Sequence, residues 1–307
     1  MAMGNLLLGV RFRGMTPIMP TAITEQGHVD ESGQRRVIDY CLENGAVALG
    51  HFGYASEFYK IGDPDRRRLI DLIVEHVRGR VPVFIGVTGL SNRIMVEHAR
   101  QAEDLGADLL MVSLPYVNLP DADGAFRLFE EIRRVVDTPI IIQDTGATSP
   151  ILTADVIARL VNEIGGIHSV KAEGTSFLDK TVQLTERLGG RVQVIGGAGG
   201  RHLIHLLHLG VTAFMTGTEA LDIHGAVVNA YLNGDEEEAA RIYFERLLPY
   251  LTFYMDHSEE LLKKMLHLRG VIDCPAVIEP RQAPPMSEVE WREFEWVLRR
   301  IDYPRQR

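Results

Sequence analysis

Short apolar runs alternate along the chain with longer stretches in which apolar residues recur at helical spacing. Nearly every run is apolar throughout, as expected of parallel strands that are covered on both faces. The runs that predict strands are Met15–Pro20, Ala46–His51, Val83–Gly86, Leu109–Val112, Ile140–Gln143, Ile167–Lys171, Val192–Ile195 and Ala213–Met215. The alternation therefore predicts a series of β-α units.

Turn and capping residues mark the helices between these runs. The predicted helices include Asp65–Arg78 after Asp63-Pro64, a helix from Ser91 to Leu105, Ala154–Ile164 after Thr153, and Leu203–Leu209 before Gly210. Eight β-α units spaced about 25–30 residues apart favour an α/β fold of the (β/α)8 barrel type. An open, doubly wound sheet is the alternative that the pattern leaves.

The pattern changes at residue 235, beyond which no run of strand type remains. We therefore predict a barrel over residues 1–234 and a C-terminal extension over residues 235–307, packed on the barrel as one structural unit. Amphipathic spacing predicts three helices in the extension, which are Glu236–Tyr254, Glu259–Leu268 and Ser287–Ile301.

Composition and charge narrow the class of protein. The 307 residues are 46% hydrophobic and 24% charged, which is typical of a globular protein with a large core. Lys and Arg number 32 against 42 Asp and Glu, and the net charge of −10 disfavours binding to nucleic acid. No apolar run approaches the roughly 20 residues that span a membrane. Two cysteines, Cys41 and Cys274, fit a reducing cytoplasm, where we expect the protein to act.

A lysine stands where the sixth apolar run ends. The active site of such a barrel lies at the carboxyl ends of its strands, and alternation places Ser169, Lys171 and Glu173 on one face, toward the barrel interior. A desolvated amine loses part of its affinity for protons and attacks carbonyls to form Schiff bases. Glu173 is placed to move a proton or to orient the amine. A purely structural Lys–Glu pair at the barrel rim is the alternative interpretation.

Other patterns have ordinary explanations as well as functional ones. The turn Gly53–Glu57 offers backbone N–H groups for a carboxylate, although the motif alone is more typical of a plain βα loop. The glycine-rich Gly196–Gly200 resembles loops that bind phosphate, which leaves a phosphosugar aldolase as a minor alternative. His202, His205 and His208 recur every three residues, which is more typical of a helical stripe than of a metal site, and we predict no bound metal.

The order of several motifs resembles that of the dihydrodipicolinate synthase / N-acetylneuraminate lyase family, from about Arg13 to the tail. The matching segments are Gly53–Glu57 with Asp65-Arg66, Gly79–Val83 with Gly86, Gly106–Asp108, Pro115-Tyr116, Pro139–Asp144, Val170-Lys171, Gly210 with Met215–Gly217, and Arg281 with Pro284-Pro285. The resemblance implies a (β/α)8 barrel with C-terminal helices, usually a homotetramer, that forms a Schiff base with pyruvate or another small 2-oxo acid. The imine-forming lysine of the family falls on Lys171.

The chain departs from the synthases of this family at the positions of their hydroxyl relay. Gln143 and Asp144 replace the first residues of the Y-N-x-P motif, and an amide cannot act as an acid or base. The remaining departures are Tyr54 and Ala55 for two threonines, Val117 for a tyrosine, and Thr148 near the position of a substrate-gripping arginine. A role in lysine biosynthesis is therefore disfavoured.

Local motifs are more similar to the 2-dehydro-3-deoxy-L-arabonate dehydratases of the family. They are Ser56–Phe58, Ile142–Asp144, Lys171–Glu173 and Met215–Gly217. This resemblance implies dehydration of a 2-oxo-3-deoxy sugar acid, with Lys171 and Glu173 as catalytic residues. The implied substrate-binding residues are Tyr54, Ala55 and Ser56 in the turn, with Tyr116, Gln143, Asp144 and Thr216 around the pocket.

Three other functions stay open at this point. They are a pyruvate-dependent aldolase of the N-acetylneuraminate or ketodeoxygluconate type, dihydrodipicolinate synthase itself, and a non-catalytic sensor of keto acids. In each catalytic case the covalent imine on Lys171 serves as the electron sink, so we expect no metal or organic cofactor.

Overall fold

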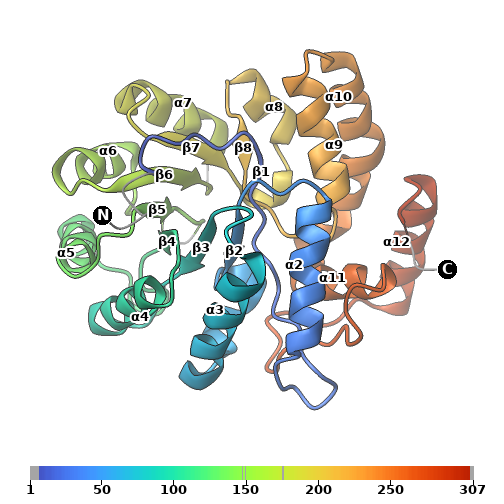
Figure 1. Cartoon of the computed structure of the whole chain (residues 1–307). Helices are drawn as coiled ribbons and strands as arrows, with labels where there is room; N and C mark the ends of the chain where they lie inside the picture. The colour runs from blue at the N-terminus through green and yellow to red at the C-terminus, as the bar shows by residue number, and fades with distance from the viewer. Residues whose placement is uncertain (1–6, 147, 149, 175, 305–307) are drawn as a thin grey trace.

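Eight parallel strands form the centre of the molecule (Figure 1). The computed structural model describes residues 7–146, 148, 150–174 and 176–304. The strands are β1 (Gly14–Met15), β2 (Leu49–His51), β3 (Val83–Gly86), β4 (Leu109–Val112), β5 (Ile140–Gln143), β6 (Ile167–Ala172), β7 (Gln193–Gly196) and β8 (Ala213–Phe214). They form one sheet in the order β1-β8-β7-β6-β5-β4-β3-β2.

The two outer strands of that order meet and close the sheet into a barrel. Val47 N donates to Met15 O at 2.8 Å, and Gly50 N donates to Pro17 O at 2.9 Å. β1 is shorter than the predicted Met15–Pro20 because Pro17 and Pro20 have no N–H for a continuous ladder. The closed ring confirms the predicted (β/α)8 barrel and excludes the open-sheet alternative.

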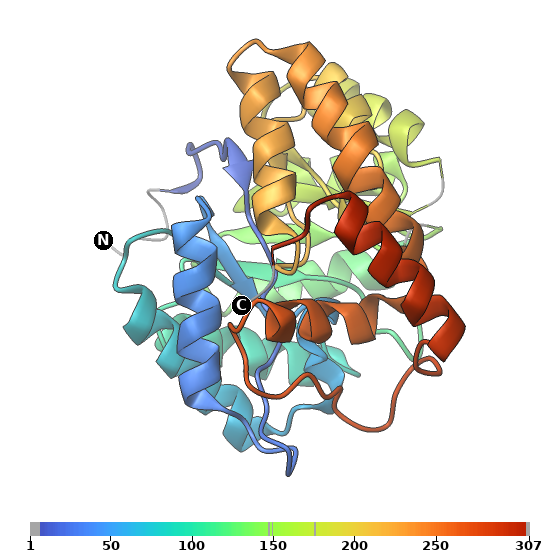
Figure 2. The ribbon, with the colours of Figure 1, turned by 90° about the vertical axis from the view of Figure 1, so that its right-hand side faces the viewer.

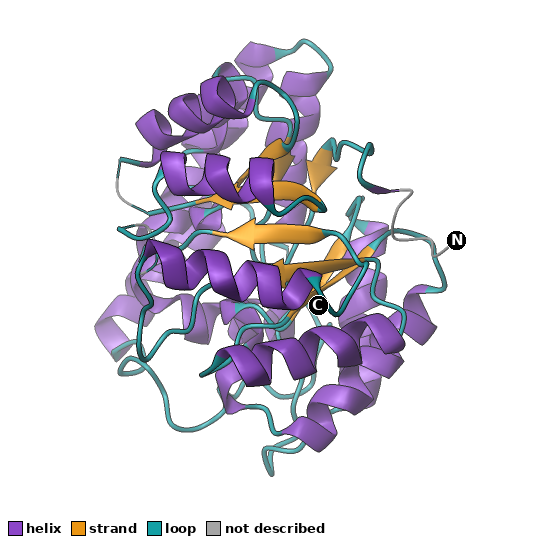
Figure 3. Cartoon of the chain, turned by 90° about the vertical axis from the view of Figure 1, so that its left-hand side faces the viewer, coloured by secondary structure: helices purple, strands orange, loops and turns teal. Residues whose placement is uncertain are grey.

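Helices surround the strands on the outside (Figure 3). Ser91 and Thr153 cap α4 and α6 as predicted, with Ser91 Oγ accepting from Ile94 N and Thr153 Oγ1 from Val156 N. The helices of the barrel are α2 (Glu31–Glu43), α3 (Asp63–Val77), α4 (Asn92–Asp104), α5 (Ala122–Arg133), α6 (Ala154–Glu163), α7 (Phe177–Leu188), α8 (Leu203–His208) and α9 (Leu221–Leu232).

Successive strand residues divide between two apolar cores. One set fills the barrel interior, and the other packs beneath the surrounding helices, as the period of two in a strand requires. On β6 the outward set is Val170 and Ala172, which leaves Ser169 and Lys171 on the inner side. The predicted inward direction of Lys171 follows from this alternation.

The C-terminal extension lies along one side of the barrel (Figures 1 and 2). It contains α10 (Glu236–Ile242), a π-helical segment η4 (Tyr243–Leu247), α11 (Leu248–Leu268) and α12 (Glu288–Arg300). The gap predicted after Tyr254 is absent, and α11 continues through it with one non-helical residue, His257, at φ −128° and ψ 29°. The π-helical turn precedes Pro249, which lacks the N–H that a regular helix uses.

Polar contacts join the extension to the barrel. Arg269 Nη2 lies 2.7 Å from Asp222 Oδ1, and the Tyr303 hydroxyl donates to the backbone carbonyl of Glu219. The side chain of Glu219 is buried at the same seam, and this burial raises its pKa to about 7, although Arg269 opposes the shift. Across the described residues, no helix has the length and apolar character needed to cross a membrane.

We expect Glu219 to make folding stability depend on pH. The folded protein keeps the Glu219 proton up to about pH 7, whereas a glutamate in the unfolded chain loses it near 4.5. Raising the pH from 5 to 8 should therefore lower the free energy of unfolding of the wild type relative to Glu219→Gln by up to about 3 kcal/mol. Urea unfolding of both proteins at the two pH values measures this difference, and parallel pH dependences contradict it.

Candidate active site

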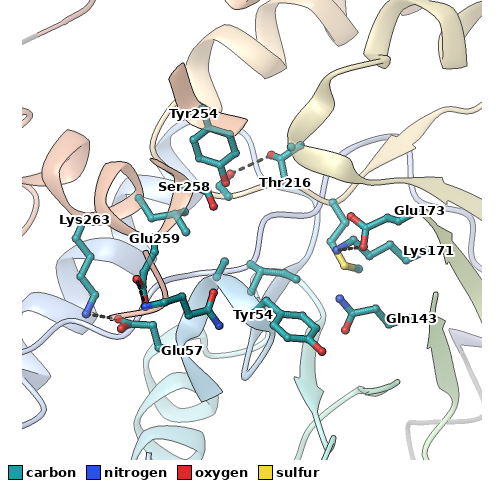
Figure 4. A pocket seen from close by; sticks show the side chains of 17 residues that line it. Tyr54, Glu57, Gln143, Lys171, Glu173, Thr216, Tyr254, Ser258, Glu259 and Lys263 are labelled. Atoms are coloured by element: carbon teal, nitrogen blue, oxygen red, sulfur yellow. Dashed lines mark hydrogen bonds and ion pairs between the residues drawn. The ribbon is translucent and has the colours of Figure 1, made fainter. Parts of the chain in front are cut away.

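A cavity opens at the carboxyl ends of the barrel strands, and α11 forms one of its walls (Figure 4). Figure 4 shows Lys171 and Gln143 at one end and Lys263 at the other, with Tyr254 and Thr216 between them. The predicted site residues that line the cavity are Tyr54, Ala55, Gln143, Lys171, Glu173 and Thr216. The structure therefore brings together side chains that are far apart in the sequence, from Tyr54 to Thr216.

Lys171 and Glu173 form an ion pair at the end of β6. Lys171 Nζ lies 3.2 Å from Glu173 Oε2, and the two side chains are 7% and 15% exposed. The other carboxylate oxygen of Glu173 accepts a hydrogen bond from Ala198 N at 2.5 Å. A carboxylate that is fixed on one side and touches the amine on the other is placed to take a proton from that amine.

Residues from β5 and from the end of β8 also line the cavity. Gln143 is the partner of Lys171 in the β5–β6 ladder, so its amide and the lysine amine enter the cavity from adjacent strands. Thr216 follows β8, and its hydroxyl donates to Gly217 O at 2.9 Å. Both side chains offer hydrogen bonds to substrate hydroxyls, as expected from their positions at strand ends.

The turn after β2 supplies the wall that faces these strands. Tyr54 and Ala55 belong to the single 3₁₀ turn η1 (Tyr54–Ser56) and line the cavity. Ser56, the third predicted residue of this turn, is fully buried away from the cavity, and its hydroxyl donates to Met19 O at 2.6 Å. Ser56 therefore ties the turn to the barrel and does not line the cavity.

Two other predicted binding residues also lie outside this cavity. Tyr116 packs edge-on against Phe58, with ring centroids 5.7 Å apart, and lines a neighbouring hollow between α3 and α4. Asp144 is fully buried and forms an ion pair with Lys180. Burial raises the pKa of Asp144 to about 6, against the effect of Lys180. Gln143 ends β5 with its side chain in the cavity. Asp144 is the next residue, so alternation along the strand directs its side chain away from the cavity.

The histidines near strand ends and in the helical stripe have ordinary structural explanations. His51 is fully buried, and burial lowers its pKa to about 3, so it is a neutral core residue. His202, His205 and His208 form a stripe of ring contacts with centroids 6.3 Å apart. Within the described ranges, no three or more His, Cys, Asp or Glu side chains are grouped as metal ligands.

The far end of the cavity consists of charged pairs that the sequence pattern did not predict. Lys263 on α11 is 1% exposed, and its Nζ lies 2.5 Å from Glu57 Oε2. Lys60 Nζ lies 3.0 Å from Glu57 Oε1 and 2.5 Å from Glu259 Oε1. These pairs fix α11 to the turns after β2 and so position Tyr254 and the rest of that wall. A rule based on strand ends does not find them, because two of the four residues are on a helix.

Fold and site together define the class of protein. The cavity lies at the carboxyl ends of the strands, where (β/α)8 barrel enzymes have their active sites, and it contains a buried lysine–glutamate pair. The chain belongs to the dihydrodipicolinate synthetase family, whose model matches residues 11–299. Members of this family are lyases, and the protein is a lyase of this family.

Its relatives include enzymes of two different activities. The chain is 30% identical over 286 residues to L-2-keto-3-deoxyarabonate dehydratase of Azospirillum brasilense, covering 91% of this chain and 90% of that protein. It is 30% identical over 263 residues to 4-hydroxy-tetrahydrodipicolinate synthase of Pelobacter propionicus, covering 85% and 89% respectively. Among solved structures it resembles YagE, a prophage protein from E. coli K12 in complex with pyruvate, with a TM-score of 0.87 and 24% identity over 96% of this chain and 100% of that one.

We predict that the buried pairs stabilise the cavity wall. Lys263→Met leaves the Glu57 carboxylate with one cation fewer in a buried site, and we expect it to lower the free energy of unfolding by about 3 kcal/mol. The control is Arg93→Met, which removes an exposed pair with Glu97 and should cost less than about 1 kcal/mol. Chemical denaturation measures both, and equal losses contradict the assignment.

Proposed function

We propose that the protein is a Schiff-base-forming lyase that dehydrates a 2-oxo-3-deoxy sugar acid. The contact between Lys171 and Glu173 is the observation that carries this proposal, because it joins a nucleophilic amine to a base inside a cavity. The similarity to a keto-deoxy-arabonate dehydratase supports the dehydration, as does an amide at Gln143 in place of a tyrosine.

The first stage is capture of the substrate carbonyl. Glu173 takes a proton from the Lys171 ammonium, and the free amine adds to C2 of the 2-oxo acid. Glu173 gives that proton to the hydroxyl of the adduct, which leaves as water, so the protonated imine forms and the Glu173 carboxylate is restored. We place the C1 carboxylate against the turn at Tyr54 and Ala55, which line the cavity wall beside Lys171.

The second stage uses the imine as an electron sink. The positive nitrogen acidifies C3, and Glu173 removes a proton from that carbon. The electron pair of the resulting enamine then expels the C4 hydroxyl, which leaves as water after gaining a proton. Hydrolysis of the imine returns the Lys171 amine and releases the unsaturated 2-oxo acid, so that the net change is loss of one water. Gln143 and Thr216 are placed to hold substrate hydroxyls during these steps.

The charges around the cavity favour a substrate with a single carboxylate. Among the described residues that line it, the cations are Lys171 and Lys263, each within 3.2 Å of a glutamate oxygen. A second carboxylate at the far end would face Glu57 and Glu259 and gain no unpaired cation. Near the position of the family's substrate-gripping arginine, Thr148 is buried and bonded to Asp144. These features disfavour the dicarboxylic substrate of the synthase.

We make a further proposal for the assembly, the compartment and the cofactor requirement of the enzyme. We propose a cytoplasmic homotetramer that needs no metal or organic cofactor, because Lys171 itself supplies the electron sink. Cys41 and Cys274 are both free and buried, which suits a reducing compartment. Size-exclusion chromatography with light scattering measures the assembly directly.

We predict dehydration without carbon–carbon cleavage. With a panel of five- and six-carbon 2-oxo-3-deoxy acids, the wild type should consume substrate and release no pyruvate, as measured by mass spectrometry and a coupled pyruvate assay. Lys171→Arg should lower kcat at least about 1,000-fold, because a guanidinium stays protonated and cannot attack a carbonyl. Release of pyruvate at the same rate as substrate is consumed would identify an aldolase. Full activity of Lys171→Arg would contradict the formation of an imine on Lys171.

A further inference from the structure

The glycine-rich loop after β7 adjoins two side chains that line the cavity, Glu173 and Tyr254. A Cβ on Gly197 would lie 2.5 Å from Glu173 Oε1, and the next residue, Ala198, donates its N–H to the same oxygen. A Cβ on Gly199 would lie 2.9 Å from Cε1 of Tyr254. Side chains at positions 197 and 199 would displace Glu173 and Tyr254. Glycine at both positions therefore leaves room for these two groups.

Tyr254 reaches this loop from the C-terminal extension. It lies on α11, its ring is buried, and it lines the same cavity as Lys171. Figure 4 shows the Tyr254 ring above the cavity with its hydroxyl directed toward the side chains of Ser258 and Thr216. Three residues further along α11, His257 breaks the regular helix, so the two parts of α11 that carry Tyr254 and Ser258 differ in direction.

The surroundings of Tyr254 keep its phenol protonated. Burial raises the pKa of Tyr254 well above 10, and the nearby Glu219 and Glu173 carboxylates raise it further. A neutral phenol is a hydrogen-bond donor to an oxygen on which negative charge develops. Hydroxide is a stronger base than phenoxide, so a phenol can protonate a leaving hydroxyl as its bond breaks.

We propose that Tyr254 is the catalytic acid that protonates the departing C4 hydroxyl, in place of the tyrosine that Gln143 replaces. This inference rests on the proposed dehydration. As the C4–O bond breaks, the Tyr254 proton passes to that oxygen and water leaves. The proton that Glu173 took from C3 then returns to the tyrosinate through water in the cavity. Each turnover therefore restores both groups and loses one water.

The test compares reactions that need the acid with reactions that do not. In Tyr254→Phe, kcat for the natural C4 hydroxyl should fall at least about 100-fold. Two readouts should change less than threefold: turnover of the 4-deoxy-4-fluoro analogue, since fluoride leaves without a proton, and exchange of the pyruvate methyl protons for deuterium, which requires only Lys171 and Glu173. NMR follows both reactions.

Controls separate this role from structure and from the proposed function. Tyr231→Phe removes a phenol on α9 that does not line the cavity and should keep wild-type kcat. Hydroxyl turnover near the wild-type rate in Tyr254→Phe overturns the inference while leaving the dehydratase intact. Equal losses in all three reactions also overturn it, because they show a structural role. A wild type that exchanges pyruvate protons but dehydrates no substrate overturns the proposed function itself.

Discussion

The proposed chemistry depends on one contact, the ion pair between Lys171 and Glu173 inside the barrel mouth. A buried ammonium without a carboxylate partner would destabilise the fold, and a carboxylate in the same place would be costly alone. The pair is possible because Lys171 faces the barrel interior on β6, Glu173 follows just beyond the end of that strand, and the loop after β7 donates Ala198 N–H to Glu173. The barrel, the glycine-rich loop and α11 all enclose this pair.

Much of the fold followed from local sequence, because parallel strands buried on both faces and capped helices leave strong patterns. The strand-end rule pointed to Lys171 and the family resemblance to Gln143 and Thr216, and all three line the cavity. The resemblance also pointed to Asp144 and Tyr116, which lie outside this cavity, since adjacent strand residues face opposite sides and aromatic packing takes Tyr116 into a separate hollow. The role of α11 could not be predicted, because pairing over long sequence separations sets where Lys263 and its helix lie.

The side chains that line the cavity support the proposed chemistry. Its two ends carry paired charges, the Gln143 amide lies at the Lys171 end, and the Tyr254 and Thr216 hydroxyls lie between the ends, an arrangement that supports the proposal of a hydroxylated substrate with one carboxylate. The Gln143 amide at the end of β5 cannot act as an acid, whereas α11 brings the Tyr254 phenol to the opposite wall. In this account the extension has a chemical role in addition to its structural one, and the glycine-rich loop accommodates two catalytic groups rather than a phosphate.

Covalent trapping tests the central claim most directly. The protein is incubated with pyruvate, treated with borohydride and digested, and each peptide is weighed by mass spectrometry. Reduction of a Schiff base should add one pyruvate-derived group to the peptide that contains Lys171, and to no other lysine peptide. Failure to gain mass under conditions in which the enzyme turns over, or a gain on another lysine such as Lys263, would contradict the account.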